Sequence, residues 1–158
     1  MLTFDNVRFQ YAVEDFSIID HLSFEVQDGE FVSIIGASGC GKSTIFRLVN
    51  KLLTPASGVI RVDGESIETK KNYCGYMPQQ DLLFPWRTVR ENLMLPMEIQ
   101  GGYSKEQMQK KADDALRSVG LADWGDKTPK ELSGGMRQRA AFARTVLTVS
   151  CPQEQQLL

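Results

Sequence analysis

A glycine-rich loop constrains this chain more than any other feature of the sequence. Residues 36–43 read Gly-Ala-Ser-Gly-Cys-Gly-Lys-Ser, which matches the pattern GxxxxGK[ST] at every fixed position. An apolar run over 31–35 precedes the loop and predicts a strand buried on both faces, and an amphipathic helical stripe over 45–53 follows it. A strand, a glycine loop and a helix in this order are typical of an α/β domain that binds phosphate at a helix N-terminus.

The chemistry of the loop follows from its residue types. Glycines let the backbone curl so that consecutive N–H groups point inward at phosphate oxygens. Lys42 is expected to bring a positive charge to the β- and γ-phosphates of a nucleotide, and the Ser43 hydroxyl is placed to ligate Mg²⁺. A chance glycine-rich turn is the alternative, and the strand and helix on either side of the loop disfavour it. The residues predicted to bind phosphate are Gly36, Ser38, Gly39, Cys40, Gly41, Lys42, Ser43 and Thr44.

Composition narrows the class of protein around this loop. The 158 residues fit one domain, and 18 basic against 20 acidic residues give a net charge of −2. That balance argues against a general nucleic-acid binder, which needs a basic excess. No apolar run approaches the roughly 20 residues that span a bilayer, and the N-terminus does not resemble a secretion signal. Three scattered cysteines and one histidine, His21, disfavour both a disulfide framework and a zinc site, which suits a reducing cytosol.

Periodicity along the chain predicts strands first and helices later. Predicted strands cover 2–11, 22–26, 31–35, 59–62 and 73–77, and predicted helices cover 88–99, 104–119 and 136–147, besides the helix after the phosphate loop. The helix 104–119 has the clearest boundaries, because Ser104 and Gln107 form a capping-box pattern at its start and Gly120 supplies a stop.

A second glycine motif opens the last predicted helix. Residues 132–139 read Leu-Ser-Gly-Gly-Met-Arg-Gln-Arg, and a serine with two glycines at a helix N-terminus is another potential anion site. An ordinary helix N-cap is the alternative. Two phosphate-binding features so far apart in one chain suggest that two copies share the nucleotide.

With this second motif the sequence resembles the ATP-binding cassette (ABC) family over nearly its whole length. Residues 132–139 look like the signature motif of that family, which closes over ATP held by the phosphate loop of another subunit. The resemblance therefore implies a head-to-tail dimer, either a homodimer or a pair of cassettes. It implies that Ser133, Gly134 and Gly135 contact the γ-phosphate of the partner's ATP, with Met136 and Gln138 completing the signature.

Two further residues take roles from the resemblance. Gln79 matches the Q-loop glutamine of the family, which helps to hold Mg²⁺ and senses the γ-phosphate, and Gln80 is the fallback for that position. Tyr11 lies where the family places an aromatic ring that stacks on adenine, although an aromatic residue of a strand core is the alternative. ATP and Mg²⁺ are the implied cofactors.

Within the family, residues 38–44 and 82–89 look like the branch that serves nitrate, sulfonate, taurine and pyrimidine-precursor importers. Such a subunit is peripheral and docks on the cytoplasmic side of a membrane permease. The segment 79–92 would lie at the surface that receives the permease, while an ordinary hydrophobic turn at Pro85-Trp86 is the alternative.

The resemblance breaks after the signature helix. The family continues with a strand ending in Asp-Glu, which supports Mg²⁺ and activates water, and later with a histidine that contacts the γ-phosphate. Residues 148–158 contain neither feature, and His21 precedes the phosphate loop. We therefore expect a cassette that is truncated at its C-terminus, or ends in foreign sequence, and whose strand 31–35 has unpaired edges.

The fold expected from these observations is α/β, a phosphate-loop NTPase of the ABC type. It comprises residues 1–158 as a single incomplete nucleotide-binding domain, with an N-terminal antiparallel β portion, a helical subdomain over about 88–132 and an atypical tail over 149–158. The expected function is the ATP-binding subunit of an importer that couples ATP binding and hydrolysis to solute uptake. A nucleotide-binding fragment without ATPase activity is the main alternative, and a soluble cassette of repair or translation is a weaker one.

Overall fold

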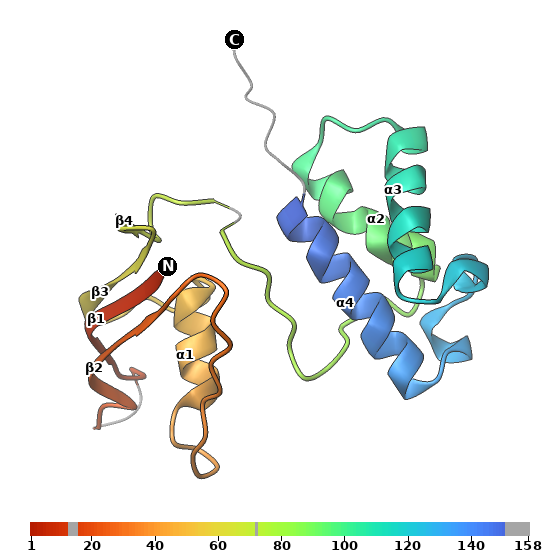
Figure 1. Ribbon diagram of the computed structural model, residues 1–158. Helices are drawn as coiled ribbons and strands as arrows, with labels where there is room; N and C mark the ends of the chain where they lie inside the picture. The colour runs from red at the N-terminus through yellow and green to blue at the C-terminus, as the bar shows by residue number, and fades with distance from the viewer. Residues whose placement is uncertain (13–15, 72, 151–158) are drawn as a thin grey trace. The chain divides into compact units, whose positions relative to one another are not determined.

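The chain divides into two compact units, Met1–Cys74 and Gly75–Leu158. The computed structural model describes residues 1–12, 16–71 and 73–150 (Figure 1). Cys151 and the rest of the atypical tail from that residue onward lie outside the described residues. Each unit has its own hydrophobic core, so each is described by itself.

An antiparallel sheet forms the first unit. The described strands are β1 (Leu2–Phe9), β2 (Ile19–Val26), β3 (Ser57–Val62) and β4 (Glu65–Ser66), in the order β2-β1-β3-β4. The expected N-terminal antiparallel β portion is therefore confirmed, and Asp63 and Gly64 form the turn that joins β3 to β4.

A bulge interrupts the pairing of β1 with both of its neighbours. Its register shifts after Phe4 against β2 and after Asp5 against β3. Asn6 adopts a left-handed conformation (φ 51°) at this point. Gly58 lies against the bulge, and a Cβ at Gly58 would approach the Asn6 carbonyl oxygen to 2.3 Å. Only glycine fits there without moving the strand.

Helix α1 (Lys42–Val49) packs its apolar stripe onto the sheet (Figure 1). Leu48 is fully buried, and Ile45 and Val49 are partly buried against the same cluster. The buried side chains of this core are Phe4, Val7, Phe9, Ile19, Leu48, Ile60 and Ile67. The sequence predicted this helix, but the structure ends it at Val49, so the stripe at Leu52 and Leu53 continues into a turn.

Two predicted strands are wrong. Residues 31–35 and 73–77 have no regular secondary structure, and Phe31 and Ile35 are 91% and 92% exposed. A strand buried on both faces needs neighbouring strands to satisfy its N–H and C=O groups. Among the described strands none pairs with either segment, so the apolar run at 31–35 lacks the partners that its composition predicts.

Helices form the second unit. They are α2 (Val89–Gln100), α3 (Lys105–Ser118), η1 (Ala122–Trp124), η2 (Pro129–Glu131) and α4 (Gly134–Ser150). The predicted capping box of Ser104 and Gln107 is confirmed at the start of α3, and the helix stops before Gly120 as predicted. A similar box, Thr88 with Glu91, begins α2, which continues through Pro96.

The core of the second unit lies between α2, α3 and α4. Val89, Leu93, Met97, Leu116 and Leu121 are among its most buried side chains. One face of α3 joins this core, since Ala112 and Leu116 are buried and Met108, Ala115 and Val119 pack beside them. In the part of the chain that the structure describes, no helix is long and apolar enough to cross a membrane.

Candidate functional site

The phosphate loop leads directly into α1, and two of its glycines, Gly39 and Gly41, adopt a backbone conformation that favours glycine. Gly41 precedes the helix in a left-handed conformation (φ 95°), and no described side chain caps the helix there. Gly39 is also left-handed (φ 81°), and a Cβ at Gly36 would lie 2.7 Å from the Cys40 sulfur. The first N–H groups of a helix have no acceptor within the helix. The start of α1 therefore presents uncapped N–H groups and a positive dipole end to an anion.

Lys42 holds its charge at the loop. Its Nζ donates to the Gly36 carbonyl at 2.8 Å and to the Ala37 carbonyl, and it lies 3.7 Å from the Cys40 sulfur. The ammonium group is thus centred on the loop rather than extended into solvent. Ser43 is exposed on the first turn of α1, whereas Thr44 is only 6% exposed.

Tyr11 lies at the margin of the first core. Its ring meets Phe9 edge to face at a centroid distance of 4.8 Å, and its hydroxyl accepts a hydrogen bond of 3.4 Å from Arg47 of α1. The residue is partly buried against the core cluster, so the ring both packs and keeps part of its surface accessible. These contacts fit the core interpretation of Tyr11, and its role toward adenine stays a prediction.

The signature residues lie at the start of α4 in the second unit. The Ser133 Oγ accepts from the Met136 N–H at 3.3 Å, which makes Ser133 an N-cap and explains why the helix begins at Gly134, two residues before the predicted start. Ser133, Gly134, Gly135 and Gln138 are exposed, while Met136 packs against the core of the unit.

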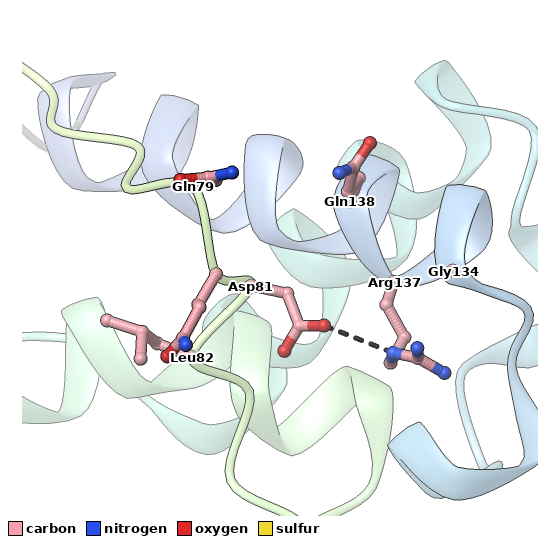
Figure 2. Close-up of a pocket in the computed structure, with 7 residues that line it drawn as sticks. Gln79, Asp81, Leu82, Gly134, Arg137 and Gln138 are labelled. Carbon is pink, nitrogen blue, oxygen red and sulfur yellow. Dashed lines mark hydrogen bonds and ion pairs between the residues drawn. The ribbon is translucent and has the colours of Figure 1, made fainter. Parts of the chain in front are cut away.

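An open pocket of about 400 Å³ separates the signature end of α4 from the Q-loop segment. Its lining residues are Gln79, Gln80, Asp81, Leu82, Gly134, Arg137 and Gln138. Figure 2 shows the Asp81 and Arg137 side chains pointing toward one another across it, joined by an ion pair of 3.1 Å. The structure therefore brings the predicted Q-loop residue Gln79 and two predicted signature residues, Gly134 and Gln138, to one pocket of the same unit.

Sequence reasoning missed the arginines that organise this pocket. Arg144 lies seven residues after Arg137, so both fall on one face of α4. Arg144 donates to the carbonyl oxygens of Asp81 and Leu82, each at 2.9 Å. Burial lowers the pKa of the Arg144 guanidinium, and the nearby Asp81 carboxylate opposes that shift. Their spacing of seven residues indicates that both arginines lie on one face of a helix. It does not indicate which residues they contact.

Asn92 was also missed. It is fully buried in α2, and its side chain bonds to the backbone of residues 84–88. Its Oδ1 accepts from the Phe84 N–H at 2.7 Å, and its Nδ2 donates to the carbonyls of Phe84 (3.1 Å), Arg87 (3.4 Å) and Thr88 (2.9 Å). A buried amide with all its groups satisfied fixes the local backbone. Beyond it, Trp86 is 75% exposed.

Metal ligands made of protein alone are not found in the described residues, where no three His, Cys, Asp or Glu side chains gather. Cys40 and Cys74 are free thiols, and burial raises the pKa of Cys74. Mg²⁺ is typically bound through one or two protein oxygens together with phosphate oxygens and water. Ser43 supplies an exposed hydroxyl of this kind beside the phosphate loop.

Comparison with known proteins identifies the family. The ABC transporter family model matches residues 19–151. The chain is 45% identical over 94% of its length to the formylaminopyrimidine import ATP-binding protein ThiZ of Halalkalibacterium halodurans, and this match covers 56% of that relative. It is 42% identical over 81% of its length to the nitrate import ATP-binding protein NrtD of a Synechocystis species, covering 48% of it. The chain thus spans about half the length of these relatives.

Solved structures agree with the sequence matches. The dimeric post-hydrolysis structure of the ATP-binding cassette MJ0796, bound to ADP and Pi, aligns with a TM-score of 0.80 at 30% identity. The alignment covers 94% of this chain and 70% of that one. The phosphate loop, the signature at the start of α4 and these matches agree with each other, and the chain belongs to the ABC transporter family as part of its ATP-binding cassette.

Proposed function

We propose that this chain is the ATP-binding part of an ABC importer subunit and that it binds Mg-ATP at the phosphate loop of its first unit. The observation that carries the proposal is the position of Lys42, whose ammonium group is centred on a glycine loop at the uncapped start of α1. A cation and free helix N–H groups at one point form a phosphate site.

Each residue of the site has a role in this proposal. The backbone of 36–44 surrounds the phosphates, and Lys42 neutralises their charge. Ser43 would ligate Mg²⁺, which stabilises negative charge on the phosphates when it is bound. Gln79 stays the Q-loop glutamine that the family resemblance predicts. Tyr11 would stack on adenine through the part of its ring that remains accessible.

The signature serves a second copy of the cassette. Ser133, Gly134 and Gly135 are exposed at the start of α4, where N–H groups and the helix dipole favour an anion. In a head-to-tail dimer they would contact the γ-phosphate of ATP held by the partner. MJ0796, to which this chain is similar, is described as dimeric, which supports such an arrangement.

The segment 79–92 would receive a membrane permease. Leu82 and Trp86 expose apolar side chains, although this backbone is tied to α2 by Asn92. Exposed aromatic groups on a rigid segment favour association with a partner. The chain would therefore act at the cytoplasmic face of the cell membrane, and the similarity to ThiZ and NrtD favours a small organic or inorganic nutrient as the solute.

Calorimetric titration of the 158-residue chain with Mg-ATP tests the nucleotide site. Lys42→Ala should weaken binding by about 2–3 kcal/mol, roughly a hundredfold, because charge-assisted hydrogen bonds to phosphate are lost. Lys71→Ala removes an exposed lysine of the same unit and should leave the affinity unchanged. Equal affinities in the Lys42 and Lys71 variants would contradict the proposed site.

A further inference from the structure

Asp81 is held on two sides by one helix. Arg137 Nε lies 3.1 Å from the Asp81 carboxylate, and the two side chains are only 36% and 28% exposed. Arg144 binds the backbone of the same turn through the Asp81 and Leu82 carbonyls. A partly shielded ion pair joined to backbone hydrogen bonds is a stronger link than an exposed pair.

The same helix begins with the signature. Arg137 lies three residues after Gly134, and its NH1 also donates to the Leu132 carbonyl at 2.7 Å, just before Ser133. A displacement of the start of α4 therefore moves the group that holds Asp81, because an α-helix behaves as a rigid rod over two turns.

The segment beyond Asp81 leads to the exposed Trp86. Asp81 Oδ1 accepts from the Leu83 N–H at 3.2 Å, and Asn92 holds the following residues from Phe84 to Thr88. The segment is thus attached to α4 at its start and to α2 at its end. Of these two attachments, only the first leads to a residue of the signature.

We propose that Asp81, Arg137 and Arg144 are positioning residues that transmit a change at the signature to the segment 79–87. This inference rests on the proposed function, because the change it transmits is contact of the signature with the ATP of a second copy. Neither arginine touches nucleotide in this proposal. Arg137 and Arg144 act through the conformation of Asp81 and Leu82.

Amide hydrogen exchange of the 158-residue chain, with and without saturating Mg-ATP, tests whether Asp81 links the signature to the segment 79–87. In the unaltered chain, ATP should slow exchange in peptides covering both 133–139 and 79–87. In Asp81→Asn, ATP should still slow exchange in 133–139, but its effect on 79–87 should be lost. Asp81→Glu keeps the charge and should restore that effect. A purely structural role would instead raise exchange of both peptides before ATP is added.

Asp113→Asn is the matched control. Asp113 accepts from Arg90 at 2.6 Å and ties α2 to α3 in the same unit, so its loss removes an ion pair without touching α4. It should leave both ATP effects intact. The link is overturned if ATP protects 79–87 equally in Asp81→Asn and the unaltered chain, or protects only 133–139 in the unaltered chain. Absence of ATP binding by calorimetry would overturn the proposed function as well, which distinguishes the two failures.

Discussion

Two helices of this chain, α1 and α4, begin at glycine motifs. The two helix starts differ in the free N–H groups and the positive charge that are available to bind an anion. At the start of α1, Gly41 provides no cap and Lys42 adds a positive charge. At the start of α4, the Ser133 hydroxyl already accepts an N–H, and the charge of Arg137 is paired with Asp81. The first is suited to holding a highly charged phosphate by itself. The second is suited to contacting a phosphate that another site already holds.

The two units also differ in how they are stabilised. The helices of the second unit bury a shared core, and most of their backbone hydrogen bonds form within each helix. The first unit depends on strand pairing, and its apolar run at 31–35 is left exposed among the described residues. Helices satisfy their backbone groups locally, whereas a strand depends on neighbours elsewhere in the chain. The difference decides which parts of a cassette form their structure from nearby sequence.

We expect the largest effect in the rate of ATP hydrolysis. This rate tests most directly the difference between the glycine motifs at the starts of α1 and α4. A polypeptide of these 158 residues should release phosphate from Mg-ATP about 10²–10⁴-fold more slowly than a cassette with a positioned base. Neither motif supplies a residue that activates water, since one binds phosphate and the other contacts it. The measurement is phosphate release by the purified chain, with Lys42→Ala as the blank. Turnover equal to that of a full-length relative and abolished in the blank would show that the water-activating group has been overlooked.

Core substitution tests the independence of the two units. Leu116→Ala should destabilise the second unit by about 2–5 kcal/mol, because the site is fully buried among α2, α3 and α4. Ile99→Ala, at an exposed position of α2, should change stability by no more than about 0.5 kcal/mol. Denaturant-dependent hydrogen exchange reports each unit separately. If Leu116→Ala accelerated exchange in β1 and β3 as strongly as in α3, the two units would unfold together.

Tyr11 sharpens the account of the first site. Tyr11→Ala should weaken Mg-ATP binding by about 1–2 kcal/mol if the ring stacks on adenine, by analogy with base stacking on aromatic side chains. Tyr11→Phe keeps the ring and loses only the contact with Arg47, so its affinity should be nearly unchanged. Calorimetry measures both, together with Mg-GTP as a second nucleotide. A loss of thermal stability in Tyr11→Ala with no change in affinity would favour the core role instead.

Local pattern explains which features were predicted from the sequence. The phosphate loop and the capping box of Ser104 depend on residues close to one another, and both were confirmed as structural elements. The strand at 31–35 was wrong because its formation depends on neighbours that composition does not identify. Arg137 and Asp81 are 56 positions apart, and no spacing rule connects them. The roles of the site residues toward ATP remain predictions that the experiments above address.

Tyr73 gives the smallest expected effect and probes the contacts at the C-terminal end of α1. Its hydroxyl donates to the Val49 carbonyl, and Lys51 lies 5.4 Å from the ring centroid. Burial raises the pKa of Tyr73 to about 12, with smaller contributions from Cys74 and Glu68. The phenol is neutral when protonated, so the folded state holds this proton more tightly than the unfolded chain, where tyrosine has a pKa of about 10.

The stability of the folded chain therefore depends on pH through Tyr73. The contribution of Tyr73 to stability is fully present below a pH of about 10 and is lost as the pH rises through about 12. Ultraviolet difference absorbance during alkaline titration should show one of the four tyrosines ionising late. Tyr73→Phe should remove that late step and no other. An unchanged titration in Tyr73→Phe, or complete ionisation of the unaltered chain well below pH 12, would mean that this end of α1 is open to solvent.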